Sequence, residues 1–226
     1  RDTSQLLLDC GFSVPHCFFT ISDDPNALEM VWLSHFHGDH FFGMPLLLLR
    51  FWEMGRTRPL TIVGQQDVET KVRGALDLAY PGFETKLSYD LRFQIIEPGV
   101  PLQLAGLTWH FAQTVHSQSN LGLLLDDGDI RLYYSGDGRP TDEVQELVQG
   151  CDLAIHEAFK LEDEIPNHGS IAVCIALAEK TSIKQLALVH LERTFRKTQQ
   201  QTIDQLLHQH PFLTLPTDGD SLLLKP

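Results

Sequence analysis

The chain has 226 residues and is acidic, with 17 lysines and arginines against 30 aspartates and glutamates and a formal charge of −13. This balance disfavours a surface for folded RNA, because the affinity of such a surface comes mainly from clustered Lys and Arg that neutralise phosphates. The longest apolar runs, 44–49 and 171–178, are far too short to span a bilayer, so no membrane contact is expected.

We predict a single domain over residues 1–226, since neither a Gly/Ser-rich linker nor a shift in composition marks a boundary. The four cysteines form no CxxC pair and show no regular spacing. They therefore indicate small apolar residues in a reducing compartment rather than a disulfide framework, and a cytoplasmic location is expected.

Hydrophobic periodicity and turn residues predict strands and helices in mixed order, that is, an α/β chain. The predicted strands are 5–9, 16–21, 29–34, 60–64, 91–97, 107–115, 120–126, 130–135, 152–156, 185–190 and 221–224. The predicted helices are 41–54, 66–79, 141–148, 169–181 and 198–209. Asp127-Gly128 indicates a hairpin with a type I′ turn, and Thr141 is typical of a helix N-cap.

A dense group of ligand-type side chains follows the apolar residues Val31-Trp32-Leu33. The group consists of His35, His37, Asp39 and His40, four such side chains within six positions. A tight loop can wrap them around a cation, and imidazole with carboxylate suits zinc, iron or manganese. A histidine-rich surface loop is the alternative, but 11 histidines in 226 residues make such clustering by chance rare. The segment therefore predicts a metal site.

The pattern of His35 to His40 resembles the metal-binding motif of the metallo-β-lactamase superfamily. Three later candidates, His116, Asp137 and His190, each follow an apolar, strand-like run, in the order that the family shows. The resemblance covers nearly the whole chain and implies a four-layer αββα sandwich. Residues 1–11 resemble the second strand of the family, so a first strand is expected upstream of residue 1.

Seven candidate ligands are too many for one tetrahedral ion. The resemblance implies two cations, most simply two Zn²⁺, with Mn²⁺ or Fe²⁺ as alternatives. Asp137 would bridge them, and a shared hydroxide would be the nucleophile. One ion would be held by His35, His37 and His116, and the other by Asp39, His40 and His190. Asp39 would also orient the nucleophile.

The second half of the chain resembles ribonuclease Z. Gly136-Asp-Gly-Arg-Pro140 and His156-Glu-Ala-Phe159 are similar to two of that family's segments, and His168 lies where it places a histidine before a helix. The resemblance implies that Glu157 orients His168, which stabilises charge or protonates the leaving oxygen. The alternatives are an exposed histidine and a buried, paired glutamate.

Several departures limit this resemblance. Only a hairpin lies between His116 and Asp137, where ribonuclease Z inserts a long basic arm that grips tRNA. Gly138 and Phe159 replace threonines, and Thr194-Phe195 replaces an Arg-Tyr pair. Together with the acidic charge, these departures favour a small phosphodiester over folded nucleic acid as the substrate.

We therefore expect a dinuclear-metal hydrolase, a phosphodiesterase in its most specific form. Hydrolysis of a thioester, lactone or sulfate ester, and tRNA 3′-end cleavage, remain as alternative activities. A metal-bound sensing or binding module is the non-enzyme alternative, and seven retained candidate ligands argue against it. The oligomeric state is left open, with a homodimer as one option.

Overall fold

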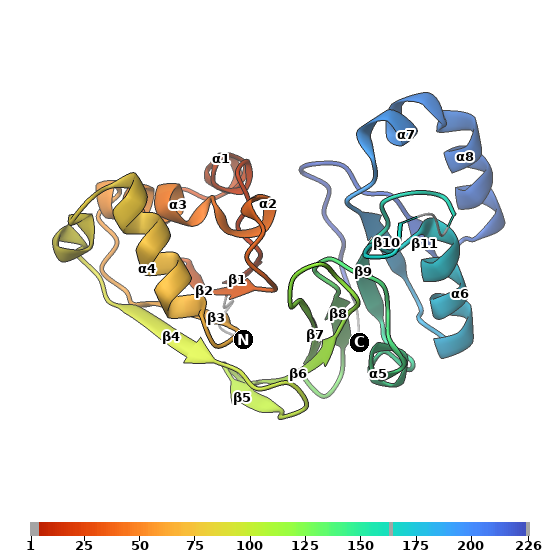
Figure 1. Ribbon diagram of the computed structural model, residues 1–226, viewed down its shortest axis with the longest axis horizontal. Coiled ribbons are helices and arrows are strands. Elements are labelled where there is room, and N and C mark those ends of the chain that lie inside the picture. Colours follow the sequence, from red (N-terminus) through yellow and green to blue (C-terminus); the bar gives the residue numbers. More distant parts are fainter. Residues whose placement is uncertain (1–4, 163–164, 225–226) are drawn as a thin grey trace. The chain divides into compact units, whose positions relative to one another are not determined.

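The computed structural model describes residues 5–162 and 165–224, which form two compact units, one up to Glu97 and one from Pro98 onward (Figure 1). Each unit is built on one β-sheet with helices beside it, in agreement with the predicted mixed α/β class. None of the helices in the described ranges is both long and apolar enough to cross a membrane. Residues 1–4, the first part of the segment expected to resemble the family's second strand, lie outside the described residues.

The first unit carries a four-stranded sheet in which all neighbouring strands are parallel. In sheet order the strands are β1 (Gln5–Leu8), β2 (Leu28–Leu33), β3 (Leu60–Gly64) and β4 (Leu91–Ile95). Strand β2 is buried along almost its whole length, as expected for an inner strand of a parallel sheet. The carboxyl ends of β1, β2 and β3 lie at one edge, so the residues that follow them are neighbours.

The helices of the first unit bury one face each in a shared apolar core. They are α1 (Val14–Ile21), α2 (Gly38–Phe41), α3 (Met44–Glu53) and α4 (Val68–Ala79), followed by the 3₁₀ helix η1 (Phe83–Lys86). Leu47, Leu48 and Phe51 of α3 are fully buried. Each such side chain contributes roughly 1.5–3 kcal/mol of burial free energy, which anchors the helix that follows the histidine-rich loop.

One predicted element of the first unit is wrong, and another begins at a different residue. Residues 16–21 were expected as a strand but belong to helix α1, because Pro15 favours the first turn of the helix and Phe18 and Phe19 pack edge-on against Phe51. The helix expected over 41–54 is confirmed as α3, which begins at Met44, three residues after the predicted start; Phe41 belongs to the preceding α2.

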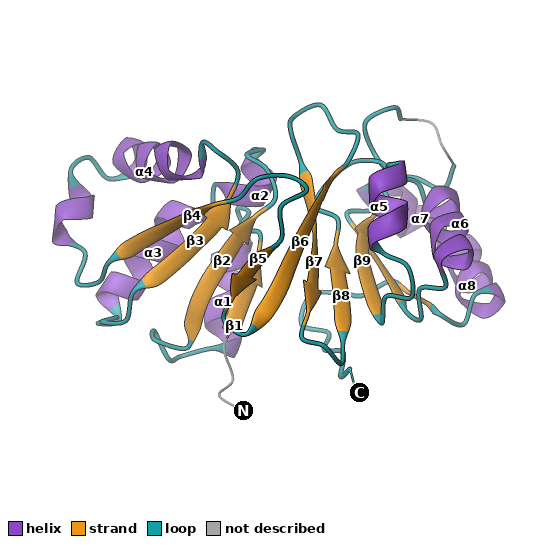
Figure 2. Cartoon of the chain, turned by 90° about the horizontal axis from the view of Figure 1, so that it is seen from below, coloured by secondary structure: helices purple, strands orange, loops and turns teal. Residues whose placement is uncertain are grey.

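The second unit carries a seven-stranded mixed sheet (Figure 2). In sheet order the strands are β11 (Leu213–Thr214), β10 (Leu186–Val189), β9 (Leu153–Glu157), β8 (Arg131–Tyr134), β7 (Leu121–Asp126), β6 (Leu107–Gln113) and β5 (Leu102–Leu104). β8, β9 and β10 are parallel, whereas β7 runs antiparallel to both β6 and β8. Consequently the carboxyl ends of β6, β8, β9 and β10 all lie on the same side of the sheet.

The helices of the second unit are α5 (Asp142–Leu147), α6 (Ile171–Thr181), α7 (Arg193–Thr198) and α8 (Gln200–Gln209). The Thr141 hydroxyl accepts a hydrogen bond from the amide of Val144, which confirms the predicted N-cap. The predicted strand 221–224 is wrong; β11 instead adds to the sheet edge. The β7–β8 hairpin is confirmed, although its loop has four residues and only Gly128 has a positive φ, so the turn is not type I′.

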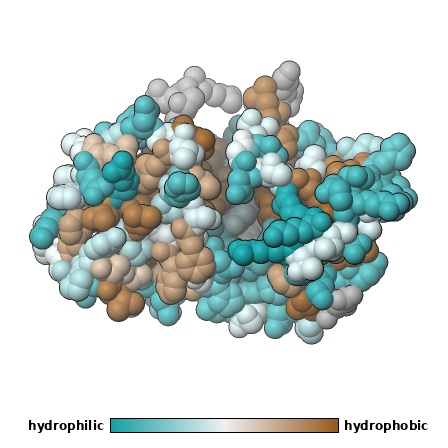
Figure 3. All heavy atoms as spheres, turned by 90° about the horizontal axis from the view of Figure 1, so that it is seen from above, coloured by the Kyte–Doolittle hydropathy of each residue, from teal (hydrophilic) through white to brown (hydrophobic). Residues whose placement is uncertain are grey.

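The surface mixes hydrophilic and apolar side chains (Figure 3). All four cysteines are unpaired thiols, in agreement with the absence of a disulfide framework. Burial raises the pKa of the Cys151 thiol to about 11 and also raises the pKa values of Cys10 and Cys174. These three side chains are therefore neutral near pH 7 and are poor nucleophiles.

Candidate metal centre and acid–base pair

The histidine-rich loop begins where β2 ends, and α2 completes it. His35 is fully buried, His40 is nearly so, and Asp39 is exposed. The Nε2 atom of His35 and the Nδ1 atom of His37 are 3.1 Å apart. Two nitrogens bound to one tetrahedral zinc ion at about 2.05 Å would be roughly 3.3 Å apart. The pair of nitrogens is therefore spaced as two ligands of a single cation would be.

Asp9, the residue after β1, fixes the orientation of this loop. Its carboxylate lies 2.7 Å from Nδ1 of His40 and accepts hydrogen bonds from the amide and the hydroxyl of Ser34. The Ser34 hydroxyl is in turn 3.1 Å from Nδ1 of His35. With Nδ1–H of His40 donating to Asp9, Nε2 keeps its lone pair for a cation, the usual carboxylate–histidine–metal arrangement. Asp9 was not among the predicted site residues.

The backbone of the loop is held by the turn after β1. The amide of Cys10 donates to the carbonyl of His40, and the amide of Gly43 donates to the carbonyl of Cys10. A Cβ atom at Gly11 would collide with the carbonyl oxygen of Asp39. Glycine is therefore required at this position by the close approach of two backbone segments.

In the second unit the direction of the strands gathers the predicted residues. His116, Asp137, Glu157 and His190 follow or end β6, β8, β9 and β10, four of the strands whose carboxyl ends lie on the same side of this sheet. Side chains from four distant parts of the sequence therefore meet there. This is the usual position of a functional site in a sheet with parallel strands.

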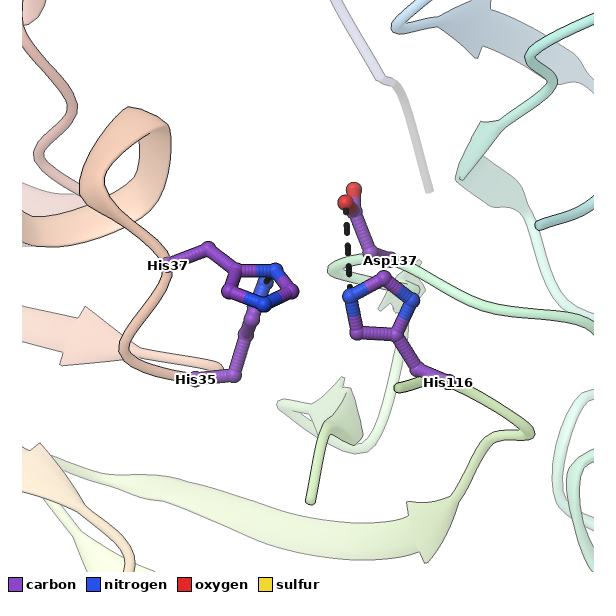
Figure 4. Close-up of side chains that lie close together, drawn as sticks. All are labelled: His35, His37, His116 and Asp137. Atoms are coloured by element: carbon purple, nitrogen blue, oxygen red, sulfur yellow. Dashed lines mark hydrogen bonds and ion pairs between the residues drawn. The ribbon is translucent and has the colours of Figure 1, made fainter. Parts of the chain in front are cut away.

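Asp137 is buried between two imidazoles. Its Oδ2 atom lies 3.9 Å from Nε2 of His116 and 3.7 Å from Nε2 of His190. Figure 4 shows the His116–Asp137 pair, together with His35 and His37 of the first unit's loop. Nδ1–H of His116 donates to the carbonyl of Asn167 at 2.8 Å, which directs Nε2 toward the carboxylate. His190 has a left-handed backbone with φ of 58°.

Asn120 is a fully buried amide that ties the Asp137 loop to β6 and β7. Its side chain donates to the Thr114 hydroxyl and to the Ser135 carbonyl, and its oxygen accepts from the amide of Asp137 at 3.1 Å. The Thr114 hydroxyl donates to the carbonyl of Asp137. No role was predicted for Asn120 from the sequence.

Glu157 and His168 form a hydrogen-bonded pair. One oxygen of the fully buried Glu157 lies 3.2 Å from Nδ1 of His168 and accepts hydrogen bonds from the amides of Gly138 and Gly169, both at 2.8 Å. The carboxylate thereby fixes the Nδ1–H tautomer and leaves Nε2 of His168 as the reactive nitrogen. The side chain of His168 is 22 % exposed, so it remains accessible to a substrate.

His156, the neighbour of Glu157, has a different role. It is fully buried, and its Nδ1–H donates to the carbonyl of Glu157 at 2.8 Å. Burial lowers its pKa, so the imidazole is neutral near pH 7. His156 is therefore a structural residue of strand β9.

Residues 4–191 match the β-lactamase superfamily domain. A relative, ribonuclease Z of Shouchella clausii, is 24% identical over 96% of this chain and 86% of its own length. The zinc-bound PqqB of Methylobacterium extorquens superposes with a TM-score of 0.76 at 16% identity, covering 99% of this chain and 84% of that protein. A diphosphatase of the PhnP family gives 0.73 at 16% identity, covering 100% and 82%.

The chain belongs to the β-lactamase superfamily. The predicted family and fold class are thereby confirmed, and the two sheets agree with them. Its similarity to enzymes named ribonuclease Z and ribonuclease BN places it among the metal-dependent hydrolases of this superfamily.

Proposed function

We propose that this protein is a dinuclear phosphodiesterase acting on small phosphodiesters. The observation that carries the proposal is the meeting of His116, Asp137, His190 and the Glu157–His168 pair at one sheet edge. Metal ligands alone would fit many hydrolases, whereas a carboxylate-oriented histidine beside them provides a proton for a leaving oxygen.

The proposed metal ligands are the seven residues expected from the sequence. One cation would be held by His35, His37 and His116, the other by Asp39, His40 and His190, and Asp137 would bridge them. The 3.1 Å spacing in the first unit and the two distances from one Asp137 oxygen in the second support this assignment. When bound, two zinc ions would lower the pKa of a shared water and stabilise charge on the phosphate.

The chain's own residues would then complete a hydrolysis. A water oxygen forms a bond to phosphorus while the bond from phosphorus to the leaving oxygen breaks. Asp39 orients the water, which gives up a proton to solvent. His168 supplies a proton from Nε2 to the leaving oxygen, so the products are a phosphomonoester and an alcohol. Glu157 holds His168 in the required tautomer and stabilises its protonated form.

The negative charge of the chain favours a small substrate over RNA. The formal charge of −13 gives few clustered cations for RNA, and the connection between His116 and Asp137 holds the β7–β8 hairpin and no basic arm. One structural neighbour is named a diphosphatase of the PhnP family rather than a ribonuclease. Precursor tRNA is the second candidate, because the sequence relatives are named ribonuclease Z.

The test is a panel of substrates assayed with the purified, zinc- or manganese-loaded protein. We expect turnover of bis-p-nitrophenyl phosphate or a dinucleoside monophosphate, and poor processing of precursor tRNA. RNA affinity should fall only shallowly across a salt series. Efficient tRNA 3′-end cleavage with a steep salt slope would favour the second candidate. Turnover of a thioester or lactone without any phosphodiester cleavage would contradict the proposal.

A further inference from the structure

The ring of Phe159 lies against two imidazoles of the second unit. Its centroid is 5.2 Å from that of His168, with 33° between the planes, and 5.9 Å from that of His190, with 42°. The two imidazoles are themselves stacked, 5.8 Å apart and only 13° from parallel. Phe159 therefore contacts both the proposed proton donor and a proposed metal ligand.

The backbone of Phe159 is fixed on both sides. Its amide donates to the carbonyl of Gly169 at 3.0 Å, and its carbonyl accepts from the amide of Glu192 at 2.9 Å. One bond connects it to the loop that carries His168, and the other to the loop that follows His190. The half-buried ring thus stands at a position set by two loops that both carry site residues.

The hydrogen bond that His168 Nδ1–H donates to Glu157 does not by itself fix the plane of the His168 ring. Combined rotations about the Cα–Cβ and Cβ–Cγ bonds could turn the ring and move Nε2 while Nδ1 stays within hydrogen-bond distance of Glu157. The ring of His116, 5.0 Å away and at 79° to the His168 ring, and the ring of Phe159 restrict this rotation. A proton donor must lie within hydrogen-bond reach of the leaving oxygen, so its ring orientation affects the rate.

We propose that Phe159 is a positioning residue that holds the His168 imidazole in the orientation for protonating the leaving oxygen. This assignment rests on the proposed phosphodiester hydrolysis for its kinetic consequence. It has a structural consequence that does not depend on activity, namely the orientation of the His168 ring. The two consequences can be measured separately.

The kinetic test compares two leaving groups. The p-nitrophenolate of bis-p-nitrophenyl phosphate leaves without a proton, whereas the ribose oxygen of a dinucleoside monophosphate requires one. We expect Phe159→Leu to lower kcat about 10-fold on the dinucleotide and less than about 2-fold on the aryl ester, because misplacement of a catalytic group reduces only steps that use it. Phe159→Tyr should restore the rate. Equal losses on both substrates would overturn the proposal.

A matched control is Phe212→Leu. Phe212 is also half-buried in the second unit and also contacts a histidine ring, that of His210 at 5.7 Å, but neither residue belongs to the proposed site. We expect no selective effect on either leaving group. A selective loss in this variant would assign the kinetic effect to general packing and overturn the proposal.

The second test observes the His168 ring by NMR in protein with isotope-labelled histidines. The His168 signals are identified by their disappearance in His168→Asn. Phe159→Leu should shift these signals, because the ring current of Phe159 is lost, and should broaden or split them as the imidazole gains orientations. Phe159→Tyr should leave them near their original positions.

The outcomes separate this inference from the proposed function. Unchanged line widths and a single orientation of His168 in Phe159→Leu would overturn the positioning role, even in an active phosphodiesterase. Altered His168 signals in a protein without phosphodiesterase activity would support the positioning role while the proposed function fails. A loss of fold in both Phe159→Leu and Phe159→Tyr would assign Phe159 to packing alone and overturn the inference.

Discussion

The two units present their candidate ligands in different ways. In the first unit, His35, His37, Asp39 and His40 come from one segment, the loop after β2 and helix α2, and Asp9, the residue after β1, holds His40. In the second unit, His116, Asp137 and His190 come from the ends of three strands. The first set depends on local sequence and the second on the topology of a sheet.

This difference determines how a substitution in each set of candidate ligands should affect metal binding and folding. A change in the loop of the first unit should remove metal without unfolding the sheet beneath it. In the second unit, the loops that carry the ligands are joined by buried side chains such as Asn120, so a change there affects several positions together. The predictions below test this contrast.

The largest expected effect is that of Asp39→Ala. The side chain is exposed, so the fold should persist, but a proposed metal ligand and the group that orients the water are lost together. Turnover should fall by more than ~10⁴-fold, and zinc content by about one equivalent. Steady-state kinetics and elemental analysis measure both. Asp67→Ala, an exposed acid after β3 in the same unit, is the control. Full activity in Asp39→Ala would remove the ligand assignment.

The next largest effect should come from His168→Ala. We expect kcat on a dinucleoside monophosphate to fall ~10²–10⁴-fold, while zinc content and melting temperature are retained. His210→Ala is a matched control, because His210 is 23 % exposed and lies 3.4 Å from Glu179, a pair similar to His168 and Glu157. Similar rates for the two variants would rule out a catalytic role of His168.

Asp9→Asn should have a moderate effect. An amide can still accept from Ser34 but no longer holds His40 with a charge, so zinc affinity should fall ~10–100-fold. Competition with a chromophoric chelator measures this change. Asp152→Asn is the control. Asp152 precedes the amino end of β9, whereas the site lies at the carboxyl end, and it pairs with Lys184, so this variant should leave zinc affinity unchanged. Equal affinities of Asp9→Asn and the parent protein would show that Asp9 serves the fold alone.

The smallest effect concerns stability and pH. Burial lowers the folded-state pKa of His156 below its ordinary value of 6.5, so the unfolded chain binds a proton first as the pH falls. The free energy of unfolding should therefore decrease below pH 6.5, by up to ~1.4 kcal/mol per pH unit, until the folded-state pKa is reached. Denaturant titrations of metal-free protein should show a shallower decrease in His156→Gln. Parallel curves for both proteins would contradict this.

The sequence predicted that His35, His37, Asp39 and His40 follow strand β2, because residues so close in sequence need no knowledge of strand pairing; the last two lie in helix α2 rather than in a loop. Asp9 could not be found in this way, since 31 positions separate it from His40 and only the parallel pairing of β1 with β2 joins them. Asn120 was missed for a similar reason, as its partners lie on a neighbouring strand and loop. A signal for Asp9 existed in its position after an apolar strand, at the edge where β2 also ends.

The incorrect predictions of secondary structure have a physical cause as well. Residues 16–21 contain aromatic and β-branched side chains that favour strands, but the contacts of Phe18 and Phe19 with Phe51 stabilise a helix. Those contacts are between distant parts of the chain. Residues 221–224 are apolar enough for a strand, yet the edge of β10 pairs with Leu213–Thr214. Which segment occupies a sheet edge is decided by chain geometry rather than by local composition.

The contact of Gly11 with the backbone of Asp39 has a consequence for mutational tolerance. Gly11 carries no chemistry, but any side chain there would displace the peptide that carries a proposed ligand. In a deep mutational scan selected on activity, Gly11 should therefore be as intolerant as the histidines themselves. Sequence variation in this protein is thus restricted at a position whose only contribution is the absence of a side chain.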